Sequence, residues 1–251
     1  MKILGTLVLA GLAFGQAPTA TPEFAAASVK PSRSGGTQGR WNTGPGSVTM
    51  TNVTLRTCVQ WAYGVKAYQV SAPEWFNDER FDIAAKSEGR VATAELRVMM
   101  QTLLAQRFQL AAHRETRELA VFALLAAKGG AKLRVSNETG APELGSGRGG
   151  ELTLSAKHAP ISTLTDLLAG PLGAPVVDMT ELTGRYDFSL DVAPYIPLGA
   201  DGRPSTAGIE TEIAAMLSMA LQEQLGLKLE ARKSPIAMIV IDHAERVPAE
   251  N

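Results

Sequence analysis

The spacing of apolar residues predicts alternating strands and helices from residue 47 onward. Strict alternation in SVTMTNV and in RFDIAAKS predicts two strands, the second with Phe81 and Ile83 turned inward. Helical spacing in TLRTCVQWAYGV predicts a helix that Thr54 caps, and residues 93–107 predict a second helix with an apolar stripe. A short extended piece and a turn at 75–78 separate these elements, and FQLAAHRE and LAVFALLAAK predict an antiparallel pair joined by a polar turn.

The same order of elements is predicted again from residue 151. ELTLSAKH predicts a strand, and the helix after it is expected to break at Gly170-Pro171. RYDFSLDV predicts a strand with its aromatic residues on one face, and a Pro- and Gly-rich excursion over 193–208 leads to a helix over 209–225. LGLKLEARK and PIAMIVIDHAE predict a last antiparallel pair.

Residues 106–124 and 223–241 match when they are set 117 positions apart, so that Phe108 falls on Leu225 and Leu124 on Ile241. We therefore expect an internal duplication and an α+β fold. It consists of two homologous β-α-β-β-α-β-β units, each with helices packed on an antiparallel or mixed sheet. The expected boundaries are an N-terminal extended segment with one strand (16–46), a first repeat (47–136), a Gly-rich linker (137–150) and a second repeat (151–247).

Residues 1–15 have the layout of a secretory signal peptide. Lys2 precedes an apolar run from Ile3 to Phe14, and small residues follow at a site suited to cleavage after Gly15. The alternative, a buried N-terminal helix, would need polar positions on one face, and the run offers only Thr6. We expect a secreted or periplasmic protein with no stable membrane insertion after signal cleavage, because no later run approaches ~20 apolar residues.

Charge and cysteine content narrow the expected partners. The 24 basic and 25 acidic residues nearly cancel, which gives no electrostatic reason to expect nucleic acid as a partner. Cys58 is the only cysteine, so no internal disulfide can form, and its helical neighbours favour a buried apolar role over a nucleophile or a metal ligand.

Motifs of catalysis and cofactor binding are missing from the sequence. Gly145, Gly147 and Gly150 have the spacing of a dinucleotide fingerprint, but they precede a predicted strand where that fingerprint requires a helix. The histidines have no second ligand at zinc spacing, and neither a G-x-S-x-G nor an S-x-x-K signature occurs. We therefore expect no cofactor, no metal site and no enzymatic activity.

Clustered aromatic residues give the remaining functional signal. Tyr63 and Trp75, with Arg80 nearby, are candidates for a surface that binds a ligand or partner, because Trp, Tyr and Arg commonly anchor interfaces. Arg185 and Asp187 are the polar candidates in the second repeat. The alternatives are core packing for the aromatic cluster and a structural ion pair for Arg185 and Asp187.

Six blocks together resemble the "soil-associated" family of uncharacterised secreted bacterial proteins. They are FAAASVKPS (24–32), NVTLRTCVQWAYGV (52–65), RFDIAAK (80–86), LLAQRFQLAAHRETRELAVFAL (103–124), VVDMTELTGRYDF (176–188) and ALQEQLGLKLEARKSPIAMIVIDHAE (220–245). The resemblance implies export and, in some relatives, fusion to membrane metallopeptidase sensors, whose motif this chain lacks. It implies no catalytic residues.

The leading hypothesis is an exported, non-enzymatic module that binds a protein, a peptide or a cell-envelope ligand. A competing hypothesis is a hydrolase of envelope or extracellular polymers, with a site between the two units that draws on His113, Asp187 or His243. It predicts a deep cleft in which a histidine and a carboxylate lie within hydrogen-bond reach of each other. A third is a structural role through exposed strand edges. The sequence specifies neither the ligand nor the oligomeric state.

Overall fold

The chain folds into two compact α+β units. The structure, a computed structural model, describes residues 21–146, 153–196 and 209–250. Unit 1 comprises the chain up to Glu115 together with the part from Met238 onward, and unit 2 comprises Thr116–Ala237.

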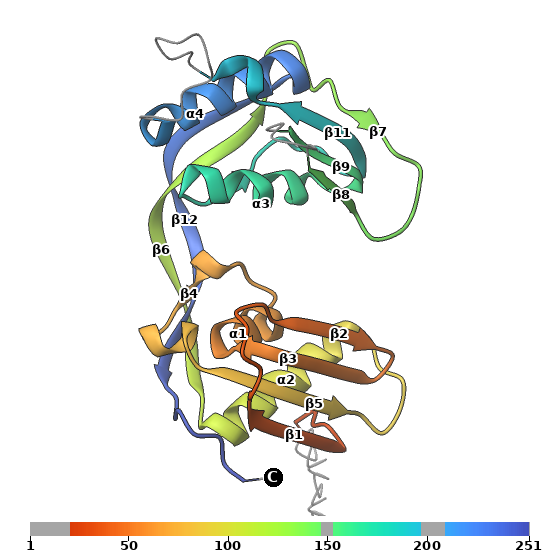
Figure 1. Ribbon diagram of the computed structural model, residues 1–251, viewed down its shortest axis with the longest axis vertical. Helices are drawn as coiled ribbons and strands as arrows, with labels where there is room; N and C mark the ends of the chain where they lie inside the picture. Colours follow the sequence, from red (N-terminus) through yellow and green to blue (C-terminus); the bar gives the residue numbers. More distant parts are fainter. Residues whose placement is uncertain (1–20, 147–152, 197–208, 251) are drawn as a thin grey trace, which may run out of the picture. The chain divides into compact units, whose positions relative to one another are not determined.

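Unit 1 is built around a four-stranded antiparallel sheet with the order β1-β5-β3-β2. Its elements up to the unit boundary are β1 (Ala26–Pro31), β2 (Arg40–Gly44), β3 (Ser47–Thr54), α1 (Leu55–Tyr63), η1 (Ala67–Gln69), β4 (Val70–Ser71), η2 (Glu74–Asn77), β5 (Arg80–Lys86) and α2 (Thr93–Phe108). The two helices pack against this sheet and share its core (Figure 1).

Local chemistry explains the first helix. Thr54 caps α1 as predicted, since its side chain accepts a hydrogen bond from the amide of Thr57 at 3.2 Å. Gly64 ends the helix in a left-handed conformation at φ 64°. Cys58 is fully buried in the core, as predicted, and this burial raises the pKa of its thiol to about 12.

Unit 2 contains a second four-stranded antiparallel sheet, with the order β7-β11-β9-β8. Its elements between the long strands are β7 (Arg134–Val135), β8 (Glu143–Ser146), β9 (Thr153–Ala159), α3 (Ile161–Leu172), β10 (Val176–Asp178), β11 (Tyr186–Asp191), η3 (Ala193–Tyr195), α4 (Ile209–Ala220) and a π-helical turn, η4 (Leu221–Leu225). The predicted break at Gly170-Pro171 is wrong, because α3 continues through Pro171 to Leu172 and ends at Gly173, whose φ is 59°.

The predicted hairpin at the end of each repeat is also wrong. Each pair is one continuous strand, β6 (Ala111–Ala126) and β12 (Leu227–His243), and no residue from Ala111 to Ala120 is buried. Because these residues are not buried, the polar stretch near Glu115–Arg117 is compatible with a continuous strand and does not mark a turn. The two strands are neighbours in a third sheet with the order β10-β6-β12-β4 (Figure 1).

Several predicted boundaries differ from the structure. The stretch 137–150, expected to be a linker, contributes β8 to the sheet of unit 2, and the segment 16–46 contains two strands where one was expected. Both sheets share one strand order when β1, β2, β3 and β5 are set on β7, β8, β9 and β11. The duplication itself stays a prediction. The expected signal peptide (1–15) lies outside the described residues, as do positions 197–208 of the excursion.

In the described residues, no helix is both long enough and apolar enough to cross a membrane.

Candidate functional site

A left-handed residue interrupts the central strand of the sheet in unit 1. Asn52 has a φ of 56°, and the register between β3 and β5 shifts between Met50 and Val53. Asp82 accepts the Asn52 amide at 2.8 Å, and the Arg80 guanidinium donates to the Asn52 carbonyl oxygen at 2.8 Å. The candidate residue Arg80 therefore holds one side of a backbone clamp.

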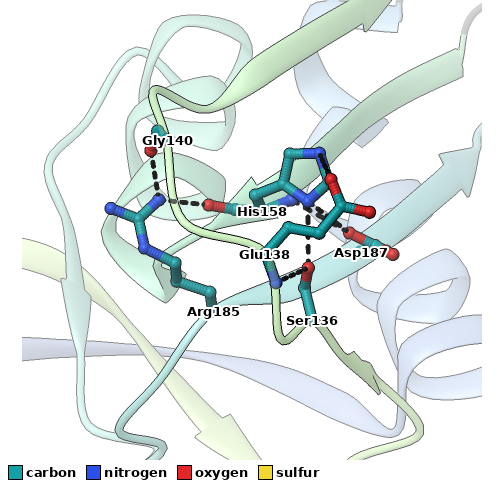
Figure 2. Close-up of polar contacts among 6 residues, drawn as sticks. All are labelled: Ser136, Glu138, Gly140, His158, Arg185 and Asp187. Carbon is teal, nitrogen blue, oxygen red and sulfur yellow. Dashed lines mark hydrogen bonds and ion pairs between the residues drawn. The ribbon is translucent and has the colours of Figure 1, made fainter.

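Unit 2 contains the same clamp. His158 has a φ of 49°; its amide donates to Asp187 at 2.9 Å, and its carbonyl oxygen accepts from Arg185 at 2.6 Å (Figure 2). Arg185 donates also to the carbonyl oxygen of Gly140 at 2.7 Å. The candidates Arg185 and Asp187 thus lie together, on either side of one bulge residue, and both engage the backbone.

The side chain of each bulge residue contacts the loop that joins the first two strands of its unit, β1 to β2 in unit 1 and β7 to β8 in unit 2. The Asn52 amide group donates to the carbonyl oxygens of Gly36 at 2.7 Å and Gln38 at 3.1 Å. His158 Nδ1 lies 2.9 Å from Ser136 Oγ, and its Nε2 lies 3.3 Å from a carboxylate oxygen of Glu138. Asn52 and His158 therefore perform the same anchoring task with different chemistry.

Ser136, His158 and Glu138 also have the composition of a nucleophile, a base and an orienting acid. The sequence did not indicate this set, because Ser136 is the last residue of the expected first repeat, Glu138 lies in the expected linker, and no motif marks either residue. The Glu138 side chain is 77% exposed, so solvent competes for its contact with the imidazole. A shallow hollow of about 450 Å³ covers the nearby strands, and its lining includes Asp187 but neither Ser136 nor His158.

The other histidines lie on unit 1. His113 Nδ1 is 2.8 Å and 3.0 Å from the two carboxylate oxygens of Asp242, and its Nε2 is 3.9 Å from Glu115. Both the imidazole and the Asp242 side chain are about half exposed. His243, the last residue of β12, is exposed. The contact between a histidine and a carboxylate that the hydrolase hypothesis predicts occurs at His113 and at His158, and the hypothesis itself stays a prediction.

Tyr63 and Trp75 are both partly buried against the core of unit 1. The Trp75 ring packs on Phe76 with centroids 4.4 Å apart, and the Arg246 guanidinium lies 5.5 Å from the Trp75 ring centroid. Burial raises the pKa of Tyr63, and the charge of Arg114 opposes that shift. These two candidates therefore contribute to packing, and the C-terminal segment covers part of Trp75.

A large apolar side chain is exposed on one edge strand of each of the two antiparallel sheets. Trp41 of β2 is 57% exposed and Leu144 of β8 is 63% exposed. Trp41 lies opposite Met50, and Leu144 lies opposite Ala156. Met50 and Ala156 each precede the left-handed residue of their sheet by two positions. The two exposed side chains thus occupy the same register position, which no sequence pattern had indicated.

Comparison with known proteins assigns the chain to a family. The profile of a family described as a protein of unknown function (DUF3738) matches residues 56–244, about three quarters of the chain, so the chain belongs to that family. No curated protein and no solved structure matches the chain.

Proposed function

We propose that this member of a family of unknown function is an exported binding module without catalytic activity. Its ligand is an extended segment of a protein or peptide of the cell envelope, which adds as a further strand beside β2 or β8. The observation that carries the proposal is the pair of exposed apolar side chains, Trp41 and Leu144, on these two edge strands.

The edge strands differ in how well they are protected. Natural sheets shield their edges with proline, charged residues or very short strands. β1 contains Lys30 and ends in Pro31, and β7 is only two residues long. β2 and β8 contain no proline, span five and four residues, and have a charged residue only at their first positions, Arg40 and Glu143. The alternate backbone groups that point away from β3 and β9 could therefore pair with a ligand strand.

Strand addition explains the exposed apolar residues. A peptide that pairs with a sheet edge gains affinity from backbone hydrogen bonds and specificity from alternate side chains. An aromatic ring beside the edge supplies the anchor that such interfaces use most often. Trp41 supplies that anchor in unit 1, and Leu144 supplies a smaller one in unit 2.

Export rests on the sequence of residues 1–15, which has the three parts of a signal peptide. The burial of Cys58 supports this proposal, because a lone exposed thiol would be vulnerable in an oxidising compartment. The measurement is N-terminal sequencing of the protein recovered from the periplasm or the medium. A start at Gln16 supports export through this signal, and an intact Met1 contradicts it.

Binding is tested with the mature chain, residues 16–251, and a displayed library of random peptides. We expect enriched peptides with alternating apolar positions. Trp41→Ala should weaken the selected peptides roughly thirty-fold, which corresponds to about 2 kcal/mol for an aromatic anchor. Val98→Ala, on α2, removes another exposed apolar side chain and serves as the matched control. Loss of binding in Trp75→Ala but not in Trp41→Ala would move the site to the aromatic cluster.

The second candidate function is a hydrolase, favoured by the 2.9 Å contact between Ser136 and His158. An activated serine reacts covalently with fluorophosphonates. We expect no labelling of the wild-type chain at Ser136, because Asn52, the residue equivalent to His158, fulfils the same anchoring role in unit 1 through its amide group. Labelling that Ser136→Ala abolishes would replace the binding proposal with a hydrolase.

A further inference from the structure

The ends of β6 and β12 are exchanged between the two units. The end of β6 completes unit 2, and the end of β12 completes unit 1. Here the first half-chain denotes β1 to β6 (residues 26–126) and the second denotes β7 to β12 (residues 134–243). Leu124, from the first half-chain, is fully buried in the core of unit 2. Ile239 and Ile241, from the second, are buried in the core of unit 1.

Strand pairing follows the same exchange. β10 pairs in parallel with the end of β6, where Val176 lies opposite Phe122. β4 pairs in parallel with the end of β12, where Ile239 lies opposite Val70. Phe122 and Ile239 are 117 positions apart, the offset at which the two sequence blocks match. The exchange is therefore reciprocal and uses matching residues.

The segments after the two strands dock in the same way. After β6, the amide of Lys132 donates to the carbonyl oxygen of Leu225 at 2.8 Å, beside the left-handed residue Gly226. After β12, the amide of Glu245 donates to the carbonyl oxygen of Phe108 at 2.7 Å, beside the left-handed residue Gln109. Each tail thus contacts the end of the second helix in the unit that it completes.

We propose that the two half-chains are obligate partners, and that each offers an acceptor site for the final strand of the other. The site in unit 1 consists of the β4 edge and the adjacent core, and it takes the aliphatic end of β12; the site beside β10 takes the end of β6. Because these contacts do not require covalent linkage, a half-chain from a second copy of the protein fits the same sites.

Probes confined to unit 1 make the exchange measurable in the full chain. All three tryptophans and the single cysteine belong to unit 1. Ile239→Ala, a change in the second half-chain, should accelerate thiol labelling of Cys58 at least tenfold. Leu124→Ala, a change in the first half-chain, should leave that rate unchanged and instead accelerate hydrogen exchange in α3. The inverse pattern, in which Leu124→Ala exposes Cys58, would mean that each half-chain closes on itself and would overturn the proposal.

Cleavage after folding provides the second measurement. A protease site is inserted after Gly129, in the exposed stretch 128–130 between β6 and β7, and the purified full chain is cut. We expect the two halves to elute together at the size of the uncut chain, with unchanged tryptophan fluorescence. Separation of the halves under native conditions would contradict the proposal.

Partner exchange tests the claim about a second copy. Cut chains of normal and isotopically heavy composition are mixed in urea and refolded by dilution. Native mass spectrometry should find hybrid pairs, a light first half with a heavy second half, beside the parent pairs. Refolding that yields only separate halves or self-pairs of one half would show that the acceptor sites do not recognise the other half-chain.

Discussion

The strongest local prediction concerns the two aspartates that accept an amide from a left-handed residue. Asp82 and Asp187 occupy equivalent places in the two clamps, at 2.8 Å and 2.9 Å from the amides of Asn52 and His158. Replacing either aspartate by alanine removes a hydrogen bond to a charged acceptor, worth roughly 1.5–3 kcal/mol. It also leaves an amide without its partner at a residue held in a conformation that costs about 1 kcal/mol.

We expect Asp82→Ala and Asp187→Ala each to lower the free energy of unfolding by about 2 kcal/mol. For a unit of this size, that corresponds to a fall of roughly 8 °C in the Tm. Asn52 is only 4% exposed, so water cannot readily replace the lost acceptor in unit 1. Asp82→Asn and Asp187→Asn keep an acceptor at the same place and should recover most of the loss.

The assay is urea unfolding followed by tryptophan fluorescence for Asp82 and by hydrogen exchange of β9 for Asp187. Different probes are needed because every tryptophan lies in unit 1. A change below about 0.5 kcal/mol for Asp187→Ala, the range of an ordinary surface substitution, would refute the clamp. Asp187 would then be available for a role in ligand binding or chemistry.

Three further predictions follow from local geometry. Native Cys58 should resist thiol reagents at neutral pH, because its pKa is raised to about 12. The stability that the neutral thiol contributes is complete below the unfolded pKa of about 8.5 and is lost as the pH rises toward 12. Thiol labelling and unfolding, both measured against pH, will check this prediction. Gly226→Ala should destabilise unit 2, since the φ of Gly226 is 63° and an added Cβ would lie 2.2 Å from the Gly130 carbonyl oxygen. Gly173→Ala, at φ 59° with open space around the added Cβ, should lower the stability of unit 2 less in the same hydrogen-exchange assay. Thr54→Ala removes the cap of α1 and should lower the stability of unit 1 by about 1 kcal/mol in urea unfolding, and an unchanged midpoint would show that the cap contributes nothing.

Local sequence patterns correctly predicted the elements whose apolar residues all pack into one core. Phe81 and Ile83 alternate along β5 and are buried as expected, and Thr54 caps α1 because the preceding strand and the helical spacing meet there. Such signals depend only on neighbours in the sequence, so they survive without knowledge of the tertiary fold.

Patterns failed where a strand leaves one core and enters another. The polar residues around Glu115 looked like a turn, because no apolar alternation continues through them. In the structure this part of β6 has no buried residue, so polar side chains are compatible with a continuous strand. The strand is held by its pairing with β12, a contact between residues more than 100 positions apart.

The candidate site shows a similar division. The sequence indicated Arg80, Arg185 and Asp187, and their shared context, an arginine followed by an aromatic residue and an aspartate, was visible in both predicted repeats. Their partners, the backbones of Asn52 and His158, lie 27 or more residues away and leave no local signal. Trp41 was missed because exposure at a sheet edge depends on the strand order, which spacing alone does not determine.

The most direct test of the binding account is backbone hydrogen exchange of the mature chain with and without a selected peptide. Strand addition predicts slowed exchange in β2, residues 40–44, or in β8, residues 143–146, and the loss of that protection in Trp41→Ala or Leu144→Ala, respectively. Protection confined to residues around Trp75, or unchanged exchange at both edges while the peptide remains bound, would contradict the account.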